Sequence, residues 1–115
     1  MIDIYADIEA AGVAVYQQGT APAAEKLPAT FATVWQDYSS DTLHADNKAV
    51  QCRHEWTVIY YAKDTQTIYS GLRAVINALK QRGYLISGQG YDVAGAWQGY
   101  DARAVDVVII ENLEA

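Results

Sequence analysis

Apolar and polar residues alternate along residues 48–63, and this is the clearest pattern in the chain. One parity is mostly apolar and holds Val50, Cys52, His54, Trp56, Val58, Tyr60 and Ala62. The other parity is polar from Gln51 to Thr57 and becomes apolar at Ile59 and Tyr61. Because successive side chains of a strand point to opposite faces, the pattern predicts a long strand with one covered face and one partly exposed face.

The next segment, residues 64–83, predicts an amphipathic helix with well-marked ends. Its apolar residues recur with a period near 3.6 and are Ile68, Leu72, Val75, Ile76 and Leu79. Asp64 is a candidate N-cap, and Gly83 can adopt the left-handed conformation that ends a helix. Lys80 and Arg82 lie in the last turn, where positive charge complements the helix dipole.

Shorter patterns predict the remaining elements. They are a helix over residues 3–11 and strands over residues 13–17, 29–38, 84–87 and about 97–111. Residues 39–47 are polar, so we expect a connection that joins two strands into a hairpin with an extended tip, and residues 88–95 predict a loop or an irregular hairpin. The order α-β-β-β-α-β-β predicts an α+β fold, a mainly antiparallel sheet with two helices packed on one face.

Length and composition predict a single globular domain over residues 1–115. The hydrophobic fraction is 51% and the charged fraction 19%. The net charge of −6 and the pI near 4.6 argue against a nucleic-acid-binding surface, which would carry clustered Lys and Arg. Cys52 has no second cysteine to pair with, so we expect a buried, inert thiol and a reducing compartment.

The chain shows no pattern of export or membrane insertion. Asp3, Asp7 and Glu9 stand where a signal peptide would carry basic residues and an apolar core. No apolar run approaches the roughly 18 residues of a membrane span. We therefore expect a soluble protein made in the cytoplasm, with no membrane partner.

Candidate chemistry is sparse. Gly88-Gln89-Gly90 matches a dinucleotide fingerprint only loosely, because no helical pattern follows it. His54 and Glu55 are neighbours on a strand and point to opposite faces, and His44 and His54 lack the short spacing of paired metal ligands. We expect no enzyme activity, no cofactor and no metal.

One pair of charged residues predicts a structural contact. Asp101 and Arg103 share a face of the last predicted strand, where they could form an exposed ion pair. Such a pair implies no acid–base chemistry.

Aromatic residues are numerous, with nine Tyr and three Trp. Tyr and Trp are favoured at protein interfaces, because they offer rigid apolar area with a polar tip. They are also favoured in ordinary strands. Both interpretations stay open at this point.

Three segments carry a resemblance to a known family. They are Glu55-Trp-Thr-Val-Ile-Tyr-Tyr-Ala-Lys-Asp64, Ile68-Tyr-Ser-Gly-Leu72 and Ala78-Leu-Lys-Gln-Arg-Gly-Tyr84. With the opening helix and the proline-containing loop before residue 29, they resemble the tail terminator, tail completion and tail-to-head joining proteins of long-tailed bacteriophages and prophages. The resemblance covers most of the chain but rests on core and turn residues, and residues 88–103 match nothing diagnostic.

The resemblance implies a structural role without catalysis. Members form rings, typically hexameric, that cap the tail tube, stop its polymerisation and contact the head–tail connector protein in the virion. The implied partners are therefore further copies of the chain, the tail tube protein and the connector protein. An acidic ring would let DNA pass without binding it.

A closed ring needs two different patches on each subunit. We expect one patch around Leu43 and His44, because Leu43 is an apolar residue within a polar connection. A Leu43 side chain folded back on the domain is the equally weighted alternative. We expect the second patch at the aromatic residues Tyr91, Trp97 and Tyr100.

Two other classes of function stay open. A small acidic binding protein, similar in role to an immunity protein or antitoxin, would mask a basic partner, because opposite charge speeds association. The fourteen acidic residues are spread along the chain, which weighs mildly against that role. An enzyme would need a pocket with convergent polar groups, and no cluster in the sequence suggests one.

Overall fold

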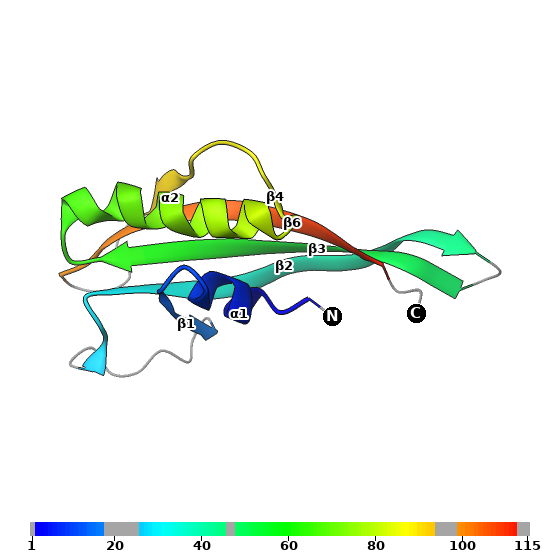
Figure 1. Cartoon of the computed structure of the whole chain (residues 1–115), viewed down its shortest axis with the longest axis horizontal. Coiled ribbons are helices and arrows are strands. Elements are labelled where there is room, and N and C mark those ends of the chain that lie inside the picture. Colours follow the sequence, from blue (N-terminus) through cyan, green and yellow to red (C-terminus); the bar gives the residue numbers. More distant parts are fainter. Residues whose placement is uncertain (1, 18–25, 46–47, 94–98, 113–115) are drawn as a thin grey trace.

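The computed structural model describes residues 2–17, 26–45, 48–93 and 99–112. The elements follow in the order α1 (Ile4–Glu9), β1 (Ala14–Gln17), β2 (Thr30–Ala45), β3 (Lys48–Ala62), α2 (Thr65–Gln81), β4 (Leu85–Ile86), β5 (Tyr91–Val93) and β6 (Asp101–Asn112) (Figure 1). The strands form one sheet in the order β1-β2-β3-β6-β4, and β5 also pairs with β6. The β1–β2 pair is parallel and the others are antiparallel. The predicted α+β class with a mainly antiparallel sheet is confirmed.

Two connections contain strand residues that the sequence pattern did not identify. Residues 39–45, expected as part of a polar connection, belong to β2 and pair with β3 as far as Ala45 opposite Lys48. A strand that extends beyond the covering helices needs no apolar parity, so its sequence looked like a loop. Residues 91–93, expected within a loop or an irregular hairpin, form β5 beside β6. These residues include only one side chain, Val93, that joins an apolar cluster, which is too little to give a periodic signal.

Helix α2 is built as its sequence predicts. The Asp64 side chain accepts a hydrogen bond from the Gln66 backbone N–H at 2.9 Å, and Gly83 has a φ of 93° just after the helix. Five apolar side chains of α2 are buried, namely Ile68, Leu72, Val75, Ile76 and Leu79. They pack in one cluster with alternate residues of the sheet, among them Val58, Tyr60 and Val105.

Helix α1 joins the same apolar cluster through Ile4 and Ile8. The Asp3 side chain caps it by accepting a hydrogen bond from the Ala6 backbone N–H at 3.1 Å. The Tyr84 hydroxyl, just after α2, donates a 2.7 Å hydrogen bond to Asp7. Burial, followed by the adjacent Asp7 carboxylate, raises the pKa of Tyr84, so this hydroxyl stays protonated as a donor. The contact ties α1 to the end of α2.

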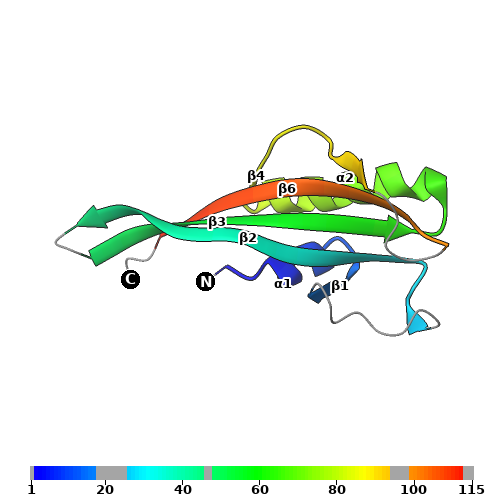
Figure 2. The ribbon, with the colours of Figure 1, turned by 180° about the vertical axis from the view of Figure 1, so that it is seen from behind.

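The other side chains of β2, β3 and β6 point to the opposite side of the sheet, which we call the open face. One end of this face carries a second apolar cluster of Leu27, Phe31, Tyr61, Tyr100 and Ala102. The Phe31 and Tyr61 rings stack with centroids 4.6 Å apart. Among the described residues no helix joins this cluster, and in Figure 2 the strands of the sheet lie in front of α2.

The sheet has an extension, which we call the arm, made of residues 38–45 of β2 and residues 48–55 of β3. Both strands continue past the two helices at one end of the molecule (Figures 1 and 2). The arm contributes to the elongated shape, with extents of 53 × 26 × 23 Å. Register shifts interrupt the β2–β3 pairing between Gln36 and Tyr38 and twice between Asp41 and His44. Such bulges bend and twist a ribbon.

Candidate interaction surfaces

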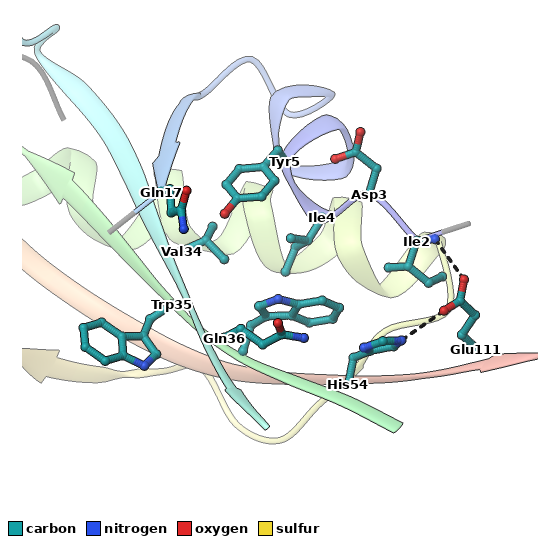
Figure 3. Close-up of a pocket in the computed structure, with 11 residues that line it drawn as sticks. Ile2, Asp3, Ile4, Tyr5, Gln17, Val34, Trp35, Gln36, His54 and Glu111 are labelled. Atoms are coloured by element: carbon teal, nitrogen blue, oxygen red, sulfur yellow. Dashed lines mark hydrogen bonds and ion pairs between the residues drawn. The ribbon is translucent and has the colours of Figure 1, made fainter. Parts of the chain in front are cut away.

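An open groove of about 650 Å³ lies between the start of α1 and the sheet (Figure 3). Its apolar lining comes mainly from Ile2, Ile4, Tyr5, Val34 and Trp56, with Trp35 at the edge of β2, and its polar lining from Asp3, Gln17, Gln36, His54 and Glu111. Ile4, Val34 and Trp56 are buried members of the core. The groove is therefore an indentation over the core with polar groups along its sides.

An imidazole–carboxylate pair forms one end of the groove (Figure 3). His54 Nε2 lies 3.0 Å from Glu111 Oε1, and the Ile2 backbone N–H donates to Glu111 Oε2 at 3.3 Å. The hydrogen bond from His54 lowers the pKa of Glu111, and the Ile2 N–H acts in the same direction. The His54 ring stacks on Trp56 at a centroid distance of 5.3 Å. The pair fixes the ring and keeps the carboxylate ionised.

A serine extends this pair into a row across three strands. Ser39 Oγ lies 3.1 Å from His54 Nδ1 and 3.4 Å from Cys52 Sγ. The order Ser–His–Glu resembles that of a hydrolase triad, but acyl transfer also needs donors preorganised for an oxyanion. Ser39 lies in the middle of a strand, not on the sharp turn that exposes such a nucleophile in hydrolases. The row is best explained as cross-strand hydrogen bonding that orders the start of the arm.

Sequence reasoning missed this row, because its three members lie 15 and 57 positions apart. Only the strand register brings them together, and a single sequence does not give the register. Within the described part of the chain, no group of three or more His, Cys, Asp or Glu side chains is placed to hold a metal ion. None of its helices is long and apolar enough to cross a bilayer.

The outer edge of β2 is open next to the groove. Strand β1 pairs with β2 only from Phe31 to Val34. Beyond Val34, no strand among the described residues pairs with this edge as far as Ala45. An open edge offers backbone donors and acceptors to an extended segment of another chain, and the bulges in β2 limit how regular such a pairing can be.

The open face carries most of the exposed large apolar side chains. Four of the five in the described structure belong to it, namely Trp35 (55% exposed), Leu85 (62%), Tyr91 (47%) and Ile110 (43%). Their register partners are Thr57, Val108, Ala104 and Arg53, which also point away from the helices. Concentrated apolar exposure of this kind marks an interaction surface more often than scattered residues do.

Two carboxylates lie at the centre of the open face. Thr57 Oγ1 lies 2.5 Å from Asp37 Oδ2 and 3.0 Å from Asp106 Oδ1. The Tyr91 hydroxyl donates to Asp106 Oδ1 at 3.1 Å. Burial raises the pKa of Tyr91, and the charges of Asp106 and Asp37 raise it further, so the hydroxyl stays a donor. A single Thr57 hydrogen cannot serve both carboxylates at once, which leaves acceptor capacity for an incoming cation.

The predicted interface residues have different locations. Tyr91 is exposed on the open face, whereas Tyr100 is 8% exposed and packs edge-on against Phe31. The Tyr100 hydroxyl donates to the Pro28 carbonyl at 2.8 Å, so in the single chain this side chain belongs to the core. The backbones of Leu43 and His44 lie on the arm opposite Gln51 and Ala49.

Three of those predicted residues are not described at the side-chain level. The side chains of Leu43 and His44, and all of Trp97, lie outside the described part of the chain. Sequence reasoning did not select Trp35, Asp37 or Asp106. Both parities of residues 31–35 carry apolar groups, so the sequence pattern does not mark Trp35 as exposed.

The expected ion pair between Asp101 and Arg103 is not formed, and each residue has another partner. Arg103 Nη1 pairs with Asp92 on β5 at 2.7 Å, and Asp101 accepts a 2.5 Å hydrogen bond from the Thr65 hydroxyl. Strand β5, which the sequence did not predict, brings Asp92 directly opposite Arg103. Arg103 also lies 5.0 Å from the Tyr69 ring centroid.

No protein-family model matches this chain, and no curated protein matches it either.

Proposed function

We propose that this chain is a structural subunit of a bacteriophage or prophage tail, similar to tail terminator and tail completion proteins. Copies associate into a closed ring, hexameric in the form that the resemblance suggests. The ring caps the tail tube and contacts the head–tail connector. The subunit acts through its surfaces and carries out no catalysis.

The observation that carries the proposal is the open face of the sheet. With both helices packed on the other face, four large apolar side chains remain exposed around Asp37 and Asp106. A small domain that leaves this area exposed loses favourable apolar burial, and association with a partner would recover it. An assembly subunit has a physical reason for such a surface.

The arm supports the same proposal. It reaches beyond the body of the domain, and its tip contains Leu43, the apolar residue that the sequence places among polar ones. The arm at one end and the open face of the sheet are different surfaces on one subunit. Different surfaces that meet between neighbours make a heterologous contact, which is the kind that closes a ring.

The charge of the chain fits passage of DNA through such a ring. A net charge of −6 repels phosphate, so an acidic lumen would let DNA pass without binding it. The proposed partners are further copies of the chain, the tail tube protein and the head–tail connector protein. The proposed location is the bacterial cytoplasm at synthesis and then the virion tail.

Native mass spectrometry across a concentration series, with negative-stain imaging of large species, tests this function. We expect a closed ring whose mass is an integer multiple of the subunit mass. Leu43→Asp at the tip of the arm should reduce ring formation, and its far-UV circular dichroism should match that of the wild type. A wild-type chain that stays monomeric at every concentration, and that also fails to bind purified tail tubes, would contradict the proposal.

A small acidic binding protein is the second candidate. The specific observation in its favour is the Asp37–Thr57–Asp106 group on an apolar surface, which suits a basic partner. Affinity purification from the native host separates the two functions. A single tight basic partner with no tail proteins would favour the second candidate, and recovery of tail proteins would favour the first.

A further inference from the structure

Helix α2 presents a surface whose charge is opposite to that of the open face. No Asp or Glu occurs between Asp64 and Asp92, whereas Arg73 and Lys80 both lie on α2. Tyr69, Arg73 and Lys80 are spaced by four and seven residues, so they share one flank of the helix. All three are exposed, Tyr69 by 52%. We call these three residues the α2 flank.

The two cations of the α2 flank form no ion pair in the described structure. Neither Arg73 nor Lys80 takes part in an ion pair there, whereas Arg82, at the end of the helix, pairs with Asp7 at 3.5 Å. Tyr69 provides an aromatic ring at the same surface, beside the partly buried Arg103, whose guanidinium lies 5.0 Å from the ring centroid. The α2 flank thus combines an exposed aromatic ring with two unpaired positive charges.

The open face offers the complementary combination. Asp37 and Asp106 converge on Thr57, and Trp35, Tyr91, Leu85 and Ile110 are the exposed apolar side chains of the same face. An Arg or Lys that reaches this group would supply the donors that the Thr57 hydroxyl cannot give to both carboxylates. It could also lie against an aromatic ring, an arrangement in which a cation gains further attraction.

We infer that the α2 flank of one copy docks on the open face of the next copy. The inference rests on the proposed function and names the two surfaces that meet. Two open faces set against each other would place carboxylates opposite carboxylates, so a symmetric face-to-face dimer is disfavoured. Because α2 packs on the other side of the sheet, each copy keeps one free surface after the contact forms. The contact is therefore heterologous and repeats around a ring.

Sedimentation velocity on charge-reversed variants tests the inference. The flank variant carries Arg73→Glu and Lys80→Glu, and the face variant carries Asp37→Lys and Asp106→Lys. Each should weaken self-association by about tenfold or more, because each brings like charges together. The matched control carries Glu9→Lys, which reverses an exposed charge on α1 away from both surfaces, and it should associate like the wild type.

Two combinations make the test specific to this pair of surfaces. The intact open face of the flank variant suits the intact α2 flank of the face variant, and the Glu-bearing flank is opposite in charge to the Lys-bearing face. An equimolar mixture should therefore regain association, with the two variants alternating. A single chain with all four substitutions restores the opposite charges in reversed order and should regain association. Circular dichroism of each variant confirms that it is folded.

The outcomes separate this inference from the proposed function. If the wild type forms rings and the flank and face variants form them equally well, these two surfaces do not meet, and the inference is overturned while the ring stands. If the flank and face variants each lose self-association and the four-substitution chain does not regain it, the inference is also overturned. If the wild type stays monomeric at every concentration, the inference fails, and the binding of tail tubes then decides the proposed function.

Discussion

The two faces of the sheet come from the same strands but differ in burial within the single chain. On the helix side, Val58 and Tyr60 of β3 are buried beneath α2. On the open face, the neighbouring Thr57 is only half-buried and hydrogen-bonds to two exposed carboxylates. The helix side is complete within one chain, whereas the open face keeps large apolar side chains in water. The difference separates residues that hold the fold from residues that are available to a partner.

The largest expected effect comes from removing apolar volume on the helix side. Leu72→Ala deletes a side chain that is 1% exposed and packs in the main cluster, so the free energy of unfolding should fall by about 3 kcal/mol. Trp35→Ala removes a larger side chain from the open face and should change the free energy of unfolding by less than about 1 kcal/mol. Urea denaturation of both variants measures the contrast. Equal losses of unfolding free energy in the two variants would show that the two faces contribute alike to stability, against this account.

A smaller and pH-dependent effect is expected at the groove. Glu111 has a lowered pKa in the folded chain, chiefly because His54 donates a hydrogen bond to it. A carboxyl group with a lowered folded pKa contributes stability above its unfolded pKa, and this contribution is lost as the pH falls through the folded value. Glu111→Gln should remove this part of the acid destabilisation, so the difference in stability between neutral and acidic pH should shrink.

Urea denaturation at a series of pH values below neutrality measures this effect. Glu9→Gln, an exposed carboxylate on α1, is the matched control. An unchanged pH profile in Glu111→Gln would show that the hydrogen bond from His54 does not contribute to folding.

The smallest effect on folding is expected at the centre of the open face. Thr57→Val keeps the shape of the side chain and removes the hydroxyl between Asp37 and Asp106. Because these groups are largely exposed to water, the free energy of unfolding should change by no more than about 1 kcal/mol. Thermal denaturation below the concentration of association measures it. A loss as large as that of Leu72→Ala would mean that the Asp37–Thr57–Asp106 group stabilises the fold and is not only a surface feature.

The sequence predicted the parts of the fold that depend on local periodicity. The parity of residues 48–63 and the period of residues 64–83 correspond to β3 and α2, including the Asp64 cap and the Gly83 end. Arm residues 39–45 were missed, because a strand that extends beyond the covering helices needs no apolar alternation. Strand β5 was missed because three residues carry no period.

The candidate surfaces could be predicted only in part. Tyr91 was selected for its aromatic character and is exposed on the open face, whereas Tyr100 was selected for the same reason and is buried. Aromatic character alone does not separate these cases, because burial depends on which segment packs above the residue. The Ser39–His54–Glu111 row and the Asp37–Thr57–Asp106 group both depend on strand register. Register comes from long-range pairing that one sequence does not reveal.

The most direct test of the central claim, that the open face is the surface covered by a partner, is hydroxyl-radical footprinting read by mass spectrometry. Side-chain oxidation is measured in dilute monomer and in the associated species of the wild type. We predict that Trp35 and Tyr91 become protected on association, whereas Tyr5 on α1, which is partly exposed and lies on the helix side away from both docking surfaces, keeps its reactivity. Equal oxidation of Trp35 and Tyr91 in the two states would contradict the claim, since a covered face cannot remain accessible to the radical.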